Sequence, residues 1–238
     1  MLPHRGSDQK LSTPDPVHPA GALLRVASWN LLRRVGAAPT DVAEFVRRHR
    51  PELLLLQEAT ADMEALPRLV GGHFFREPMQ RRIYGLAVWS PHPLPQPKIL
   101  RLPMSTLPGR VPLRIAQFIE FRGISFVNVH LSHGQFLNRW QLLHIIRHLR
   151  GPAAIIGDFN AIGPTRLPGF RDIGPREPTH HTSNIVRLRL DRCLAQGLRC
   201  DAARVLDRGA SDHHPIILEL AREVDVETRR PSIFRLRS

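Results

Sequence analysis

The sequence predicts a sheet-rich α/β chain in which two β-sheets pack together and helices cover the outside. A strand–helix–strand pattern occurs twice, at residues 23–58 and 124–160, and both copies place polar residues where apolar strands end. Further short apolar runs between and after these units have the composition of additional strands. The length of 238 residues suits one domain.

The first unit begins with "LLRVASWN", a short apolar strand that ends at Asn30. "TDVAEFVRRH" follows, with Thr40 as the expected N-cap and Val42, Phe45 and Val46 on one face of a helix. "PELLLLQE" is then a buried strand that ends at Glu58. The unit therefore places an amide and a carboxylate at two strand ends.

The second unit repeats this order. "ISFVNVHL" is a strand with His130 near its end, and "PAAIIGDFN" is a strand that ends at Asp158 and Asn160. Between them, "FLNRWQLLHIIRHL" is an amphipathic helix, because apolar residues recur at helical spacing at Leu142, Ile145, Ile146 and Leu149. Ligands of such folds gather beyond strand ends, so these polar residues are the first candidates for a site.

The other expected strands are "YGLAVWS", "VPLRIAQFIEF", "RLRLDRCL" and "PIILEL". Three irregular basic stretches remain: "REPMQRR", "RLPMSTLPGR" and "GPTRLPGFRDIGPREPTHHTSN". Irregular segments of this length inside a compact domain are usually functional or disordered.

The chain divides into a disordered N-terminal arm at residues 1–22, a folded body at 23–221 and a charged tail at 222–238. No apolar run approaches the ~18–20 residues that span a bilayer, and the first residues lack the apolar core of a signal peptide. We therefore expect a cytoplasmic protein, with a monomer as the default state. Cys193 and Cys200 read as small apolar residues in a reducing compartment.

The net charge of +13 indicates anionic partners. Lys10 and Lys98 are the two lysines among 34 basic side chains, so 32 are arginines. GC-rich codon usage can produce that preference for arginine, but it does not produce the excess of positive charge. We expect nucleic acid as the first partner and an anionic lipid surface as the second.

Asp158 and Asn160 stand two residues apart, which in an extended chain places both side chains on the same side. A carboxylate beside an amide can hold a water molecule, accept its proton and fix its position. The alternative is an ordinary Gly-Asp turn after a strand.

Glu58 follows four leucines and a glutamine, where a carboxylate is costly unless it is paired or binds a metal. Oxygen ligands such as Glu58 and Asn30 suit Mg²⁺, Mn²⁺ or Ca²⁺.

"GASDHHPIILEL" places Asp212 and His213 on a turn before an apolar strand. A histidine there can serve as a general acid or a phosphate ligand if an acid orients it, and Asp191 is the candidate acid. His214 competes for this assignment, and we favour His213 because it adjoins the aspartate. A surface or core histidine is the alternative.

His130 and Arg114 are the candidate phosphate ligands. Arg114 interrupts an apolar strand, and a guanidinium binds phosphate oxygens in a bidentate manner. One polar residue at a strand end is ordinary, whereas six such positions in separate apolar runs are not. Because no cysteine ligand or serine nucleophile stands out, the set indicates metal-assisted attack of water on phosphate.

The order of these motifs resembles the endonuclease/exonuclease/phosphatase superfamily, which shares the pancreatic-deoxyribonuclease fold. The matching stretches are "ASWN", "LLLLQEA", "GLAVWSPHPL", "VNVHL", "IIGDFNAIG", "LRLDRCL" and "SDHHPI", and they span about residues 26–218. The resemblance implies an α+β fold, a four-layer αββα sandwich of two mixed β-sheets flanked by helices. It also implies that the body at 23–221 is a catalytic domain with its site at one sheet edge.

The resemblance further implies roles for these residues. Asn30 and Glu58 bind a divalent metal, Mg²⁺ with Mn²⁺ as the alternative, and Asp212 supports the metal or His213. Asp158 orients or deprotonates the attacking water, while Asn160 holds water and phosphate. His213, oriented by Asp191, binds phosphate or transfers a proton. His130 matches a phosphate-contacting position, and Arg114 is a looser match to one.

One departure concerns the metal. Family members often carry a second acidic ligand two residues after the asparagine of "SWN", and this position is Leu32 here. The departure favours one ion over two.

The superfamily hydrolyses phosphoesters of several classes, so the site does not select the substrate. We predict a metal-dependent nuclease, with a phosphatase or phosphodiesterase acting on phospholipid or small phosphoesters as the alternative. A non-catalytic binding module is a third reading, and the intact site residues argue against it. We expect the phosphate backbone to be contacted by loop arginines, namely Arg81, Arg82, Arg101, Arg110, Arg166 and Arg171. Phe136 and Trp140 are interpreted as helix core.

Overall fold

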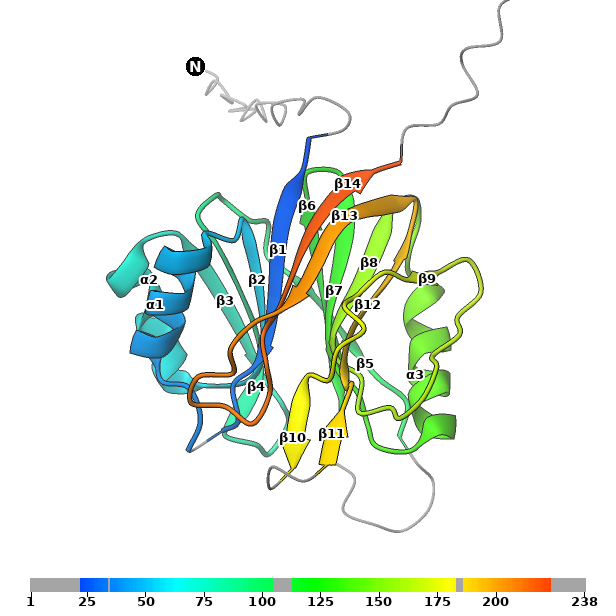
Figure 1. The fold of residues 1–238 in the computed structure, drawn as a ribbon, viewed down its shortest axis with the longest axis horizontal. Helices are drawn as coiled ribbons and strands as arrows, with labels where there is room; N and C mark the ends of the chain where they lie inside the picture. The colour runs from blue at the N-terminus through cyan, green and yellow to red at the C-terminus, as the bar shows by residue number, and fades with distance from the viewer. Residues whose placement is uncertain (1–21, 34, 105–112, 183–185, 224–238) are drawn as a thin grey trace, which may run out of the picture.

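Two mixed β-sheets pack face to face and helices cover their outer faces (Figure 1). The structure is a computed structural model that describes residues 22–33, 35–104, 113–182 and 186–223. The arrangement is a four-layer αββα sandwich, and the predicted α+β fold class is confirmed.

The first sheet has the strand order β13-β14-β1-β2-β4-β3. Its strands are β1 (Leu24–Asn30), β2 (Leu53–Thr60), β3 (His73–Pro78), β4 (Tyr84–Ser90), β13 (Leu198–Val205) and β14 (Ile216–Arg222). β1 and β2 are parallel, and the other neighbours are antiparallel. α1 (Pro39–His49), the 3-10 helix η1 (Ala61–Ala65) and α2 (Leu66–Val70) lie on the outer side of this sheet.

The second sheet has the strand order β5-β6-β7-β8-β12-β9. Its strands are β5 (Lys98–Arg101), β6 (Ile115–Phe121), β7 (Ile124–His130), β8 (Ala153–Asp158), β9 (Arg171–Asp172) and β12 (Asp191–Gln196). β7 and β8 are parallel, and α3 (Gln135–Ile146) covers the outer face. A hairpin of β10 (His180–Thr182) and β11 (Val186–Leu188) stands at the lower edge in Figure 1.

The run of four leucines in β2 shows why its sequence does not alternate. Leu53 and Leu55 belong to the core between the two sheets, whereas Leu54 and Leu56 pack toward α1 and α2. Both faces of the strand are therefore buried, as is usual for a central strand next to a parallel neighbour. The same holds for β8, where Ile156 faces the other sheet and Ile155 faces α3.

Both predicted strand–helix–strand units are present, with local differences. Thr40 is not the N-cap, because α1 already begins at Pro39 and Ala38 precedes it. The Ala38 amide donates to Asp41 Oδ2 at 2.8 Å, so an aspartate inside the first turn satisfies the helix start. The predicted strand "RLRLDRCL" is two strands, β11 and β12, that belong to different sheets.

Sequence reasoning also missed strands. β3 covers residues 73–78 and includes the start of the "REPMQRR" stretch, and β13 was not predicted at all. Both are edge strands of the first sheet, and apart from Leu198 their positions are half-buried or exposed, so their apolar pattern is weak.

The division into arm, body and tail stays a prediction. Ala22, Arg222 and Glu223 are the parts of the expected arm and tail that the structure describes, and β14 continues to Arg222. Within the described ranges, no helix has the length and apolar character needed to cross a membrane.

Candidate active site

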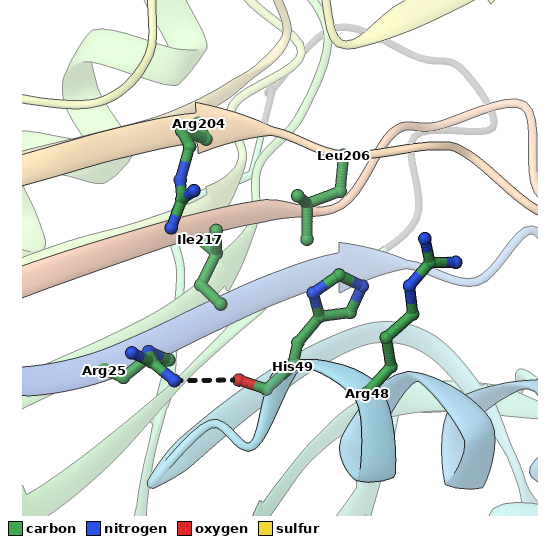
Figure 2. A pocket seen from close by; sticks show the side chains of 6 residues that line it. All are labelled: Arg25, Arg48, His49, Arg204, Leu206 and Ile217. Carbon is green, nitrogen blue, oxygen red and sulfur yellow. Dashed lines mark hydrogen bonds between the residues drawn. The ribbon is translucent and has the colours of Figure 1, made fainter.

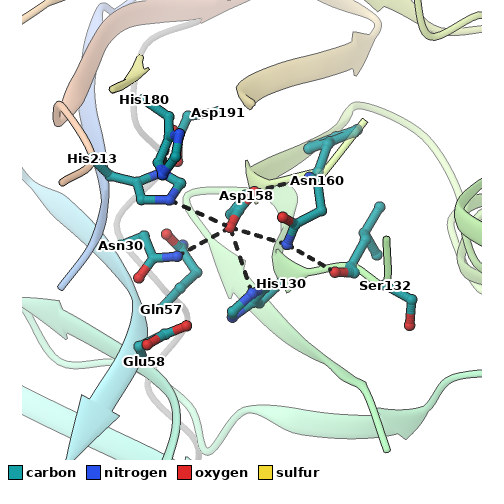
Figure 3. Close-up of polar contacts among 12 residues, drawn as sticks. Asn30, Gln57, Glu58, His130, Ser132, Asp158, Asn160, His180, Asp191 and His213 are labelled. Carbon is teal, nitrogen blue, oxygen red and sulfur yellow. Dashed lines mark hydrogen bonds and ion pairs between the residues drawn. The ribbon is translucent and has the colours of Figure 1, made fainter. Parts of the chain in front are cut away.

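Strands β1, β2, β7 and β8 carry their polar residues to one edge of the sandwich, the lower edge in Figure 1. Figure 3 shows these side chains converging on Asp158, which ends β8. Asn30 comes from the first sheet, and its Nδ2 donates to Asp158 Oδ2 at 3.0 Å. The site therefore lies where the two sheets meet.

Asp158 is the centre of the cluster and is 1% exposed. Its Oδ2 also accepts from Asn160 Nδ2 at 3.1 Å, and its Oδ1 accepts from the Asn160 backbone amide at 2.8 Å. Burial raises the pKa of Asp158, and the nearby Asp191 carboxylate acts in the same direction. The donors hold this carboxylate in one orientation at the mouth of the site.

Asp158 and Asn160 come together as expected, but not through the strand alternation that was expected to align them. β8 ends at Asp158, and Asn160 has a left-handed backbone with φ of 47°. A turn, and not strand alternation, brings its amide back onto the carboxylate. Asn160 Nδ2 also donates to the Leu131 carbonyl at 3.1 Å, which ties the turn to the end of β7.

His213 and Asp191 form a buried pair, with Nδ1 and Oδ2 2.8 Å apart. Nε2 of His213 lies 3.9 Å from Asp158 Oδ2. Burial works against a charged imidazole, but the carboxylates of Asp191 and Asp158 outweigh it and raise the pKa of His213 to about 10. His213 is therefore an imidazolium at neutral pH. The neighbouring His214 points elsewhere, with Nδ1 2.8 Å from the Leu206 carbonyl.

Backbone and hydroxyl contacts fix this pair. Thr179 Oγ1 accepts from the Leu190 and Asp191 amides at 3.0 and 2.9 Å. Trp29 Nε1 donates to the His213 carbonyl at 3.2 Å. Sequence reasoning gave Thr179 and Trp29 no role, because their contacts cross long separations in the chain.

His130 and Arg114 both have a buried side-chain nitrogen without a hydrogen-bond partner among the described residues. His130 Nε2 lies 3.5 Å from Asp158 Oδ2, and burial together with the Arg114 charge keeps the pKa of His130 well below its ordinary value. Among the described residues, His130 Nδ1 and Arg114 Nε have no hydrogen-bond partner. Arg114 is buried, and its NH1 approaches Met79 Sδ at 3.9 Å. A buried guanidinium without a carboxylate partner is suited to an anionic ligand.

Glu58 is not the last residue of β2. It sits at an irregularity of the β2–β4 pairing, between Leu56 and Ala59, and has a left-handed φ of 56°. Its carboxylate accepts from the Arg33 amide at 3.0 Å and from Arg33 NH1 at 3.0 and 3.2 Å. The Arg33 guanidinium also lies over the Tyr84 ring, 4.7 Å from its centroid. Sequence reasoning missed Arg33, which is one residue after the departure at Leu32.

Asp212, the third member of the predicted metal set, contacts a histidine. Its Oδ2 pairs with His180 Nε2 at 3.4 Å. Ligand atoms of His180, Asp212 and His213 lie within 4.8 Å of one another, but a protonated His213 has no lone pair to offer a metal. The assignment of Asp212 to the metal of Glu58 and Asn30 stays a prediction.

Glu58 and Asn30 do fit a hard cation. Both offer oxygen donors, and a guanidinium already contacts both oxygens of Glu58, so the carboxylate stands where a cation is favoured. Asn30 Oδ1 accepts from the Leu32 amide at 3.2 Å and retains a second lone pair.

A buried network of side-chain amides lies between the two sheets next to the site. Gln57 Nε2 donates to Asn128 Oδ1 at 2.7 Å and to Ser28 Oγ at 3.1 Å. Asn128 Nδ2 is 3.1 Å from Gln117 Oε1 and 2.9 Å from the Ala87 carbonyl. This network links the two sheets next to Asn30, Glu58 and His130. This network was foreseeable from Gln57 in "QE" and Asn128 in "NVH", since a polar residue inside an apolar strand requires hydrogen-bond partners.

Gly157 allows β7 and β8 to approach closely beside Asp158. Its φ is 141°, and a Cβ there would lie 2.1 Å from the Val129 carbonyl oxygen. The glycine before Asp158 is thus a steric requirement.

The loop arginines separate into two groups. Arg81 and Arg82 precede β4 and Arg101 ends β5, so these three lie toward the site edge, whereas Arg166 lies in the loop between β8 and β9. Arg171 is wrong as a site contact, because it pairs with Glu223 at the far end of β14. Arg110 lies outside the described residues.

A separate pocket of about 260 Å³ lies beside the end of α1 (Figure 2). It is lined by Arg25, Arg48, His49, Arg204, Leu206 and Ile217. Its walls contain none of the predicted site residues, and Arg25 NH1 donates to the His49 carbonyl at 3.3 Å.

The fold and the Asp158-centred site define a hydrolase of the phosphoesterase type. The model of the Endonuclease/Exonuclease/phosphatase family matches residues 27–213, and this chain belongs to that family. The family generally uses a divalent metal.

Relatives and solved structures agree with this membership. The chain is 29% identical to a UPF0294 protein of Klebsiella pneumoniae (strain 342) over 234 residues, which covers 87% of each chain. A family protein from Bacteroides thetaiotaomicron has a TM-score of 0.70 at 18% identity, covering 86% of this chain and 99% of that one. Humanized D. rerio TDP2 has a TM-score of 0.67 at 17% identity, covering 83% and 98%. A mannosyl-6-phosphatase of B. thetaiotaomicron VPI-5482 has a TM-score of 0.67 at 19% identity, covering 83% and 99%.

Proposed function

We propose that this chain is a divalent-metal-dependent phosphodiester hydrolase that attacks phosphate with an activated water molecule. The observation that carries the proposal is the buried Asp158 carboxylate, held by three amide donors and faced by His130 and by the His213–Asp191 pair. Such a carboxylate can orient a water molecule and accept its proton.

The other side chains divide the remaining work. His213 is a cation at neutral pH, so it binds a phosphate oxygen or donates a proton to the leaving oxygen, and Asp191 keeps the imidazole oriented. The buried Arg114 contributes donors for the phosphate oxygens, and the neutral His130 offers one N–H, which is shared between Asp158 and the phosphate according to its tautomer. Asn160 fixes the position of Asp158.

Glu58 and Asn30 are the residues that hold the metal, Mg²⁺ with Mn²⁺ as the alternative. When bound there, the ion neutralises charge that develops on the phosphoryl oxygens. Arg33 must then leave the Glu58 oxygens that it contacts.

Nucleic acid is the substrate that the charge of the chain supports, which makes a nuclease our first assignment. Arg81, Arg82 and Arg101 extend a positive field along the site edge. A phospholipid or small phosphoester is the second candidate, because several large apolar side chains are exposed at the same edge, including Phe136 and Ile162.

The test uses the full chain with supercoiled plasmid DNA and with bis(p-nitrophenyl) phosphate, each with Mg²⁺ and with EDTA. His213→Gln is compared with His214→Gln, the adjacent control whose ring faces the Leu206 carbonyl. We expect metal-dependent cleavage that His213→Gln loses and His214→Gln keeps. Equal activity in His213→Gln and wild type overturns the site, and no hydrolysis of either substrate with any divalent ion overturns the proposed activity. Hydrolysis of the small diester without plasmid cleavage moves the assignment to the second candidate.

A further inference from the structure

Exposed apolar side chains are concentrated at the site edge. Among the described residues, the large hydrophobic side chains that are exposed number nine, and Leu23, Leu69 and Ile99 are three of them. The other six, which we call the apolar rim, are Val35, Ile83, Met104, Phe136, Trp140 and Ile162.

The topology brings the rim to one edge. Val35 follows the end of β1, and Ile162 follows the end of β8. Ile83 immediately precedes β4, whose first residue Tyr84 pairs with Thr60 at the end of β2. Met104 follows β5, whose last residue Arg101 pairs with the first residue of β6. All of these strand ends lie at the edge that contains Asp158.

The aromatic part of the rim belongs to α3, which follows β7. The prediction that Phe136 and Trp140 form helix core is wrong, since they are 95% and 51% exposed. α3 turns Leu142 and Ile145 to the sheet, so residues 136 and 140, one helical turn apart, face outward together. Gln135 Nε2 donates to the Ile162 carbonyl at 3.1 Å, which places Ile162 beside the first turn of the helix.

Arginines accompany the rim. Arg139 lies between Phe136 and Trp140 in the sequence, and its NH1 donates to the Arg166 carbonyl at 3.0 Å. Arg33, Arg81, Arg82 and Arg101 follow or precede the same strand ends. The edge therefore combines exposed apolar groups with positive charge, the two features by which proteins bind anionic interfaces.

We propose that the site edge docks on an anionic lipid bilayer, with the apolar rim entering the boundary between head groups and acyl chains. The arginines contact lipid phosphates, as basic residues do in interfacial proteins. In this orientation the Asp158 site faces the head groups. The inference goes beyond the proposed hydrolase activity, because docking requires no turnover.

A bilayer accounts for the rim better than single-stranded nucleic acid does. Bases stack on the flat faces of aromatic rings, so Phe136 and Trp140 alone could serve nucleic acid. Val35, Ile83 and Ile162 have no such face, yet they share the edge and are more than half exposed. An acyl boundary accepts all five, because burial of apolar surface there is not directional.

The experiment titrates the full chain, in EDTA, with vesicles of phosphatidylglycerol and phosphatidylcholine in equal amounts and with phosphatidylcholine vesicles. Trp29 and Trp89 are each 3% exposed, so a blue shift of tryptophan emission on binding reports Trp140. The test variant is Phe136→Gln/Ile162→Gln, which keeps Trp140 and both termini. The control is Leu23→Gln/Leu69→Gln, which removes exposed apolar groups away from the site edge.

We expect binding and a blue shift with the anionic vesicles, weaker binding to phosphatidylcholine alone, and affinity lowered about tenfold or more in the test variant but not in the control. Thermal unfolding of both variants near the wild-type temperature verifies that the fold is retained. Absence of vesicle binding by the wild type overturns the proposal. So does equal affinity of wild type and test variant, which would assign binding to charge alone. A loss of oligonucleotide binding in the test variant with vesicle binding unchanged would assign the rim to nucleic acid.

Discussion

Replacing Asp191 with asparagine tests the electrostatics of the site. Asp191 is fully buried, and its Oδ2 lies 2.8 Å from His213 Nδ1. Asparagine has nearly the same shape and can still accept a hydrogen bond from the ring, so the substitution removes mainly the negative charge. The buried His213 imidazolium then loses the negative charge of Asp191 and keeps only that of Asp158 close by.

The magnitude follows from the geometry. At a separation of 2.8 Å and an effective dielectric constant near 20, two unit charges attract by about 6 kcal/mol. The pKa of His213 is about 10 against an ordinary 6.5, a difference that corresponds to about 5 kcal/mol of preference for the charged ring. Removing one partner of a buried ion pair typically costs about 3–5 kcal/mol of stability. We therefore expect Asp191→Asn to lower the free energy of unfolding by about 3–5 kcal/mol near neutral pH.

The pH dependence has a definite sign. Because the folded-state pKa of His213 is raised, its contribution to stability is complete below the unfolded pKa of 6.5 and is lost as pH rises toward about 10. The difference in unfolding free energy between wild type and Asp191→Asn should therefore be largest at about pH 6 and shrink toward about pH 10.

Urea unfolding of both proteins at the two pH values measures this difference, and Asp201→Asn on the exposed edge strand β13 is the control. Metal-dependent hydrolysis by Asp191→Asn should also fall by about 100-fold or more at neutral pH. A destabilisation that is the same at both pH values would refute the assignment of a charged His213.

Two further predictions concern groups next to Asp158 and the proposed metal ligands. Arg33→Ala should bind Mg²⁺ more tightly, by about tenfold, because a guanidinium no longer competes for both oxygens of Glu58; titration calorimetry measures this, and unchanged affinity would show that Arg33 does not oppose the ion. Gly157→Ala should destabilise the fold by about 3 kcal/mol or more, since its Cβ would meet the Val129 carbonyl at 2.1 Å; a thermal unfolding temperature equal to that of wild type would contradict this packing.

Much of the site was predictable because strand ends are predictable. Parallel neighbours β1 and β2, and β7 and β8, end at the same edge, so apolar runs that close with Asn30, His130 and Asp158 bring those side chains together. His213 was favoured over His214 because it adjoins Asp212, and the structure places Asp191 on His213.

Other features depend on contacts that no local pattern encodes. Asp212 adjoins His213 in the sequence, yet its carboxylate turns to His180 from the β10–β11 hairpin. Arg33 reaches Glu58 through two left-handed backbone positions. One is Leu32, which precedes Arg33, and the other is Glu58 itself. These outcomes depend on backbone turns, which short-range apolar periodicity does not report.

The exposure of Phe136 and Trp140 shows a further limit. In a helix with apolar residues on more than one face, the sequence does not determine which face is buried. In α3 the buried face is the one with Leu142 and Ile145, which contact the sheet. Phe136 and Trp140 lie on the opposite, exposed face. Their apolar character then indicates a binding role, because packing within the fold does not explain it.

The proposed hydrolysis requires the Asp158 carboxylate. The decisive measurement is the rate of bis(p-nitrophenyl) phosphate hydrolysis with saturating Mg²⁺ by wild type and Asp158→Asn, with Asp201→Asn as the control. Asparagine keeps the shape of the side chain but cannot accept a proton from water, so we expect a loss of about 100-fold or more with the fold and Mg²⁺ binding retained. Wild-type turnover by Asp158→Asn would contradict the claim that this carboxylate activates the attacking water.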